Sequence, residues 1–373
     1  MRIAFVIPTL GPGGAERVAS LLSSDWASRK HVVDLIAFET DPAEPFHSLD
    51  RNVTIHRLEA ARKTSGLFAR ASANVKRIAR LRALLRRLRP EIVVAFMTEA
   101  NVVALVASHA LPCRVVVSER NQPNRPGLAM VHRLARRLFY HRAAAIVMQT
   151  EGLADWARAR FRTRVDVIPN PVAFHNAASG GTQLAKRRDG DTLTIVAVGR
   201  LAPQKGFDVL IESFARLAAK HPKWNVVIYG EGPQRSELIE LIERRQLKQR
   251  VALPGLTKDV ARALSEGALF VLPSRFEGFP NALLEALSLG IPAIATECPG
   301  ASADILAHGT YGKLVPPGDV PALTEALETM MTTPDLRRAY AARAREALHD
   351  YEIAKVSVRW LALFESIAAP RTN

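Results

Sequence analysis

The chain has 373 residues, of which 48% are hydrophobic and 6% aromatic, and its formal net charge at pH 7 is +15. This length favours two domains over one core, and there is no apolar run of the roughly 18 residues that a membrane-spanning helix needs. The charge indicates an anionic partner: nucleic acid, an anionic membrane or a phosphorylated substrate. Nucleic acid is disfavoured, because aromatic residues are few and the common nucleic-acid-binding motifs are absent.

Apolar strands alternate with helical patterns along the first half of the chain. We interpret residues 1–8 as a first strand rather than a signal peptide, because the apolar core is short and glycines and Glu16 follow at once. Cys113 and Cys298 form no motif and suit a reducing cytosol. Including this first strand, strands are predicted near residues 3–8, 32–38, 53–58, 92–96, 115–118, 144–148 and 165–168.

The middle of the chain has the composition of a hinge and linker. Pro169-Asn170-Pro171 precedes a stretch rich in alanine, serine and glycine at 177–182. A strand is predicted near 193–198, and a second alternating series runs to about residue 349. The segment 353–368 reads as a helix with Trp360 and Phe364 on one face. The pattern predicts an α/β protein with two parallel-sheet domains.

Two carboxylates flank a predicted strand–loop–helix unit. The apolar run 268–272 reads as a buried strand, Glu277 lies on the following Gly/Pro-rich loop, and Glu285 lies in the next helix. The free N–H groups of a helix N-terminus favour an anion, whereas carboxylates accept hydrogen bonds from sugar hydroxyls. A nucleotide-sugar has phosphates between two sets of hydroxyls, so it suits this arrangement.

Two further loops carry candidate site residues. Arg200 and Lys205 flank the loop after the strand at 194–198, where they suit a diphosphate, although solvated surface cations are the simpler interpretation of charge alone. Glycines at 11, 13 and 14 follow the first strand and allow a ligand close approach to the backbone. A G-x-G-x-x-G dinucleotide motif does not fit, because Glu16 occupies the third glycine's place; a tight turn is the alternative.

The segment from Glu277 to Glu285 resembles the E-x7-E motif of the retaining family 4 glycosyltransferases, which have the GT-B fold. Shorter matches follow along the chain in the family's order, and together they are specific to the superfamily. They are Gly13-Gly14-Ala15-Glu16-Arg17, Gly199-Arg200-Leu201 with Lys205-Gly206, Gly230-Glu231-Gly232 and Pro316-Pro317-Gly318-Asp319.

The resemblance implies two Rossmann-like domains whose parallel sheets face a central cleft. It implies an acceptor-binding domain at 1–172, a hinge at 173–191 and a nucleotide-sugar-binding domain at 192–352. The final helix, 353–373, would pack back on the first domain.

The resemblance also implies roles for individual residues. Arg200 and Lys205 would hold the donor diphosphate, Glu277 the sugar hydroxyls and Glu285 the ribose. The backbone of Gly278, Phe279, Pro280 and Asn281 would line the diphosphate, and Gly13 and Gly14 would lie near the donor phosphates and the acceptor. Arg200, Lys205, Glu277 and Arg120 are the catalytic candidates. No metal and no cofactor is expected.

One position departs from the family. Arg120 occupies the place of a histidine that many members carry after a strand and serine. A guanidinium is no base near neutral pH, so we expect Arg120 to bind phosphate or a substrate hydroxyl. Asp189-Gly190-Asp191 matches the D-x-D metal motif of another glycosyltransferase fold, but we interpret it as a polar linker.

The segment 62–89 contains ten lysines and arginines and no acid. Its leucines recur at helical spacing, which favours a basic amphipathic helix over 74–89 that docks on anionic lipid, with the leucines in the interface. An ordinary domain helix with a solvated basic face is the alternative.

We therefore expect a retaining glycosyltransferase. It would transfer a hexose or N-acetylhexosamine from a nucleoside-diphosphate sugar, with UDP favoured, to a lipid-linked saccharide in polysaccharide or lipopolysaccharide synthesis. The expected location is cytoplasmic, at the inner face of the plasma membrane. The alternatives are a nucleotide-sugar epimerase of the same architecture and a non-catalytic nucleotide-sugar-binding protein.

Overall fold

The computed structural model describes residues 1–39, 44–58, 67–120, 130–174, 192–298 and 300–368. The chain forms two compact units, Met1–Pro171 with Ile353–Asn373, and Val172–Glu352. Most of the predicted linker, 175–191, lies outside the described residues. The two points where the chain changes unit are adjacent, because Val172 and Glu352 form an isolated parallel bridge and Val172 N donates to Tyr351 O (2.7 Å).

The first unit is built on a seven-stranded parallel sheet of order β3-β2-β1-β4-β5-β6-β7. Every predicted strand of this half is present, with both ends within one residue of the prediction. The central strands are apolar throughout because helices cover both faces of a parallel sheet. The strands are β1 (Arg2–Ile7), β2 (Val32–Ala37), β3 (Val53–Arg57), β4 (Ile92–Phe96), β5 (Arg114–Ser118), β6 (Ala145–Met148) and β7 (Val165–Val167).

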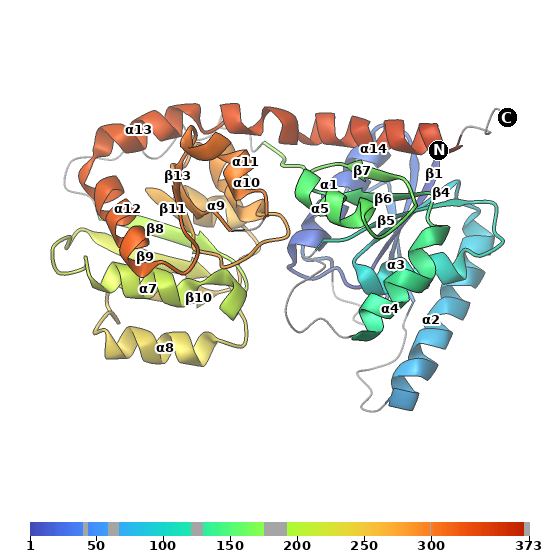
Figure 1. The fold of residues 1–373 in the computed structure, drawn as a ribbon, viewed down its shortest axis with the longest axis horizontal. Coiled ribbons are helices and arrows are strands. Elements are labelled where there is room, and N and C mark those ends of the chain that lie inside the picture. The colour runs from blue at the N-terminus through green and yellow to red at the C-terminus, as the bar shows by residue number, and fades with distance from the viewer. Residues whose placement is uncertain (40–43, 59–66, 121–129, 175–191, 299, 369–373) are drawn as a thin grey trace. The chain divides into compact units, whose positions relative to one another are not determined.

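The final helix, α14, belongs to the first unit and lies beside α1 (Figure 1). The buried rings of Trp360 and Phe364 meet Trp26 of α1 at centroid distances of 6.3 and 5.2 Å, so the predicted helix and its aromatic face are confirmed. The helices of this unit are α1 (Gly14–Ser28), α2 (Leu67–Leu88), α3 (Thr98–Ala107), α4 (Met130–Phe139), the 3-10 helix η1 (Tyr140–Arg142), α5 (Glu151–Arg158) and α14 (Ile353–Ala368).

Helix α2 contains the predicted basic helix but does not present its leucines to the outside. Leu81, Leu84 and Leu85 are buried in the hydrophobic core of the first unit. Leucines that pack on the protein's own sheet are not available to enter lipid, so the prediction that they dip into a membrane is wrong. Arg86 and Arg87 are exposed, as the alternative of a solvated basic face requires.

The second unit has a six-stranded parallel sheet of order β10-β9-β8-β11-β12-β13. Its strands are β8 (Leu193–Val198), β9 (Trp224–Tyr229), β10 (Val251–Gly255), β11 (Leu269–Leu272), β12 (Ala293–Thr296) and β13 (Lys313–Val315). Its helices are η3 (Pro203–Lys205), α7 (Phe207–Ala215), α8 (Arg235–Arg244), α9 (Val260–Ser265), α10 (Asn281–Ser288), α11 (Ser302–Ile305), η4 (Ala307–Gly309), α12 (Val320–Thr332), α13 (Pro334–Arg343) and η5 (Glu346–Tyr351).

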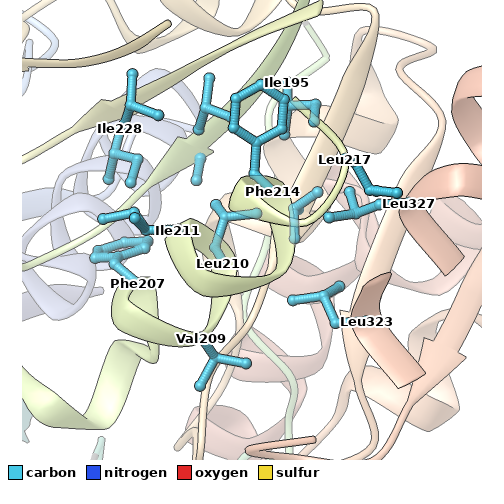
Figure 2. Close-up of a cluster of buried hydrophobic side chains, with 14 of the residues drawn as sticks. Ile195, Phe207, Val209, Leu210, Ile211, Phe214, Leu217, Ile228, Leu323 and Leu327 are labelled. Atoms are coloured by element: carbon cyan, nitrogen blue, oxygen red, sulfur yellow. The ribbon is translucent and has the colours of Figure 1, made fainter. Parts of the chain in front are cut away.

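Helix α7 forms the centre of one core of the second unit. Leu210 and Phe214 point from α7 toward the sheet, and Leu323 and Leu327 of α12 pack beside them (Figure 2). All four side chains are at most 1% exposed. This packing fixes the start of α7, and therefore the loop between β8 and α7.

Both sheets are doubly wound: successive strands are added on one side of the unit's first strand, and later strands are added on its other side. The switch lies between β1 and β4 in the first unit and between β8 and β11 in the second. In open parallel sheets, ligands bind outside the carboxyl ends of the strands at this switch point. The fold therefore indicates that ligands bind at the loops after these four strands.

Candidate active site

Two loops meet at the switch point of the second unit: the β8 loop, residues 199–206, and the β11 loop, residues 273–280. Gly206 has a φ of +64°, and a Cβ there would lie 2.1 Å from Pro273 O. Only glycine allows the two loops to approach this closely, so packing alone explains the glycine that follows Lys205. Arg275 N donates to Gln204 O (2.8 Å), and Gln204 Nε2 donates to Phe276 O (2.9 Å).

The junction of these loops holds a partly buried ion pair. Lys205 Nζ donates to Glu277 Oε1 (2.6 Å), and Ser274 Oγ donates to the same oxygen (2.6 Å). Glu277 is 3% exposed. Its Oε2 accepts no hydrogen bond within the described part of the chain. The carboxylate is thus fixed by one oxygen and retains the other as an acceptor, as contact with a hydroxyl requires.

Arg275 strengthens the same junction from the side. Its guanidinium binds both carboxylate oxygens of Asp208 at the start of α7 (2.8 and 2.6 Å) and also donates to Pro203 O (2.8 Å). Paired N–H donors of this kind fix orientation as well as distance. The sequence motifs did not single out Arg275 or Asp208; their role is to hold the two loops in register.

Helix α10 carries the second carboxylate of the motif. Glu285 is 7% exposed, in a helix whose other buried residues include Leu283, Leu284 and Leu287. The sequence predicted a helix at this position, and the structure confirms it. The residues expected to line the diphosphate, Gly278, Phe279, Pro280 and Asn281, form the turn that leads into its N-terminus.

Arg200 differs from Lys205 in its surroundings. It is exposed, and among the described residues its side chain makes no hydrogen bond or ion pair. A cation in this position at the carboxyl end of β8 is free to bind an anion. Of the two predicted diphosphate ligands, one is already paired with Glu277 and the other is unengaged.

The remaining short motifs have structural explanations. A Cβ on Gly230 would lie 1.9 Å from Gly199 O, so the loop after β9 packs directly on the β8 loop. Asp319 of the Pro-Pro-Gly-Asp stretch caps α12, accepting from Ala322 N (2.9 Å). These residues shape the second unit and are not themselves required to touch a ligand.

In the first unit the glycine loop leads from β1 into α1, with Gly13 at the helix N-cap and Gly14 as the first helical residue. Thr9 Oγ1 donates to Glu16 Oε1 (2.9 Å). Burial raises the pKa of Glu16, although this hydrogen bond acts to lower it. His47 donates from Nε2 to Gly13 O (3.3 Å), and burial lowers its pKa to about 4. Sequence patterns do not place His47 here, because no spacing links it to the loop.

Arg120 follows β5 at the same edge of this sheet. It is 9% exposed, its guanidinium lies 3.4 Å from the ring centroid of Phe96, and its Nη1 donates to Asn170 Oδ1. Burial lowers its pKa. Its Nε and Nη2 have no hydrogen-bond partner in the described ranges. A buried cation with two unused donors is suited to an anion or a hydroxyl.

No group of three or more histidine, cysteine, aspartate or glutamate side chains among the described residues has the arrangement of a metal site. Asp189 and Asp191 lie outside those residues. In the same part of the chain, no helix is long and apolar enough to cross a bilayer.

Both halves of the chain match models of known protein families. The model described as "Glycosyl transferase 4-like domain" matches residues 13–171, and the model described as "Glycosyl transferases group 1" matches residues 183–347. This chain is a two-domain glycosyltransferase. Both halves of this glycosyltransferase are therefore accounted for by known domains.

Individual relatives share about a quarter to a third of their aligned residues with this chain. The chain is 34% identical over 230 residues to an exopolysaccharide phosphotransferase of Streptomyces coelicolor, covering 61% of this chain but 24% of that protein. It is 26% identical over 370 residues to a Campylobacter jejuni enzyme, covering 98% and 99% of the two chains. That enzyme is named GalNAc-alpha-(1->4)-GalNAc-alpha-(1->3)-diNAcBac-PP-undecaprenol alpha-1,4-N-acetyl-D-galactosaminyltransferase.

Among solved structures, a sucrose-phosphate synthase of Thermosynechococcus elongatus superimposes with a TM-score of 0.84 at 18% identity, covering 98% of this chain and 99% of the other. At this identity the likeness shows the fold. This glycosyltransferase thus has the GT-B fold expected from its sequence, with two Rossmann-like parallel-sheet domains.

Proposed function

We propose that this glycosyltransferase is a retaining, family 4 type enzyme that transfers a hexose or N-acetylhexosamine from a nucleoside-diphosphate sugar to a lipid-linked saccharide. The observation that carries the proposal is the Lys205–Glu277 pair at the β8–β11 switch point, with Arg200 unengaged on the same loop. The relative from Campylobacter jejuni, which the chain matches over nearly its full length, is named for a PP-undecaprenol acceptor.

The chemistry divides among the residues of the second unit. Arg200 and the N-terminus of α10 would bind the donor diphosphate and stabilise the charge that develops as it leaves. Glu277, fixed by Lys205 and Ser274, would accept hydrogen bonds from the donor sugar through its free Oε2. Glu285 would bind the ribose.

In the proposed reaction, the bond between the anomeric carbon and the β-phosphate oxygen breaks, and its electrons leave with the nucleoside diphosphate. The acceptor hydroxyl oxygen bonds to the same face of the anomeric carbon, and its proton passes to the departing phosphate. The protein supplies orientation and charge stabilisation. The first unit, with Arg120 and the glycine loop, would bind the acceptor. We propose that the enzyme acts in the cytoplasm, at the inner face of the membrane that carries its acceptor.

A direct test combines a panel of nucleoside-diphosphate sugars with a short-chain polyprenyl-diphosphate saccharide and follows products by mass spectrometry and NMR. The proposal expects a saccharide extended by one residue, with the anomeric configuration of the donor. An inverted product would reject retention, and an isomerised free sugar formed without acceptor would indicate an epimerase. Donor binding without any reaction would indicate a binding protein.

A further inference from the structure

Helix α4 is oriented with its apolar side outward. Met130, Val131, Leu134 and Leu138 are between 52% and 75% exposed. At about 3.6 residues per turn, these positions lie on one face of the helix. We name these four residues the α4 stripe. Exposed large apolar residues that gather on one helix face indicate an interaction surface, whereas scattered ones do not.

The opposite face of α4 explains why the helix sits this way. Arg136 points inward, is 3% exposed, and its Nη1 lies 3.8 Å from Glu119 Oε1. Its guanidinium also lies 5.2 Å from the centroid of the Trp156 ring. Glu119 in turn accepts from Tyr140 and from Thr98 Oγ1 (3.0 Å). The ion pair and its hydrogen bonds anchor the polar side of α4 to the protein, so the apolar side must face outward.

The charge beside the stripe selects the kind of partner. Arg133 and Arg137 are exposed on the flank of the stripe and form no ion pair with any residue the structure describes. Residues 130–142 contain four arginines and no aspartate or glutamate. An apolar face bordered by unpaired arginines complements a bilayer surface with anionic head groups, where the side chains enter the interface and the cations meet phosphates.

We propose that α4, rather than α2, is the element through which this protein docks on anionic membranes. In α2 the leucines are buried and several arginines are engaged: Arg77 pairs with Glu99, and Arg82 donates to Ala107 O (2.9 Å). In α4 both the apolar and the basic side chains are available. The inference concerns membrane attachment and does not rest on the transfer reaction.

The test measures co-sedimentation of the full chain, without substrates, with phosphatidylcholine vesicles that contain or lack phosphatidylglycerol. Arg133→Glu/Arg137→Glu should lower binding to anionic vesicles by about tenfold or more, whereas the matched reversal on α2, Arg86→Glu/Arg87→Glu, should change it much less. Leu134→Ser/Leu138→Ser should also release the protein, and this loss should persist at high salt because apolar burial is not screened. Ile239→Ser/Leu256→Ser, at exposed apolar positions of the second unit, is the control.

Other occupants of the stripe give different results. If Leu134→Ser/Leu138→Ser converts a dimer into a monomer in sedimentation velocity, with vesicle binding retained, the stripe joins two copies of the chain. If the same variant lowers the Tm and leaves vesicle binding unchanged, the stripe packs within the protein. Equal loss of binding from the α2 and α4 reversals would show that general charge attracts the protein. Each result overturns the proposal.

Discussion

Lys205 and Glu277, which lie 72 positions apart in the chain, form an ion pair of 2.6 Å between the loops after β8 and β11. The pair depends on the strand order, because β8 and β11 are neighbours in the sheet and parallel, so their carboxyl ends meet at one edge. A residue expected to bind diphosphate and one expected to bind sugar are therefore in direct contact. Their effects on activity and stability must be separated experimentally.

Lys205→Ala should lower both activity and stability. It leaves the buried Glu277 carboxylate without its cation, which costs roughly 1–3 kcal/mol of unfolding free energy, and it should lower kcat/KM by about 10²-fold or more. Lys205→Ala/Glu277→Gln should recover much of the stability and none of the activity. If the single and double variants unfold at the same denaturant concentration, the pair is not coupled in the way its geometry indicates.

Arg200→Ala isolates the charge effect. Arg200 is exposed and bonded to no described residue, so its loss should leave the unfolding transition unchanged. It should still reduce kcat/KM by roughly 10²-fold, the scale of removing one charge-stabilising donor. Arg216→Ala, at an exposed arginine of the same unit just after α7, is a suitable comparison. Wild-type turnover by Arg200→Ala would remove this residue from the diphosphate site.

The sequence predicted the fold well because parallel strands buried on both faces appear as continuous apolar runs bounded by turn residues. It placed β1 to β7 within a residue and identified α14 with its aromatic face. It failed for α2, where periodicity could not show whether the leucine side faces the core or lipid. It also missed α4, because an amphipathic pattern does not reveal that the helix is turned outward.

Short motifs predicted the residues of the candidate site but not the hydrogen bonds and ion pairs between them. The motifs contain Glu277 and Lys205 but carry no information on their contact, which arises from sheet order. Arg275 and Asp208 were missed because an arginine and an aspartate 67 positions apart form no local pattern. His47 was missed for the same reason: only the folded chain brings it to Gly13.

Removal of divalent metal should have little effect. Diphosphate charge in the proposed site is met by Arg200 and a helix N-terminus, so excess chelator should leave transfer within about twofold of the untreated rate. The measurement is the initial rate of transfer before chelation, after chelation, and after Mg²⁺ or Mn²⁺ is added back. Activity that disappears on chelation and returns with metal would direct attention to Asp189 and Asp191.

His47 should make stability depend on pH. Its pKa is about 4 in the folded protein against an ordinary value of 6.5, so between these values the unfolded chain binds more protons than the folded one. The free energy of unfolding should therefore rise as pH increases through this window and fall as pH decreases. His47→Gln should flatten the dependence in denaturant titrations, whereas His349→Gln serves as a control. An unchanged slope in His47→Gln would assign the dependence to other groups.

Whether the β8–β11 edge binds the nucleoside diphosphate of a sugar donor is tested by calorimetric titration of a panel of nucleoside diphosphates into the protein. One of them, with UDP favoured, should bind the wild type. Glu285→Gln should weaken that binding by about tenfold or more, while Glu277→Gln should leave it largely intact and abolish sugar transfer. The proposed donor site is contradicted if no nucleoside diphosphate binds, or if Glu277→Gln weakens binding of the bare nucleotide and Glu285→Gln does not.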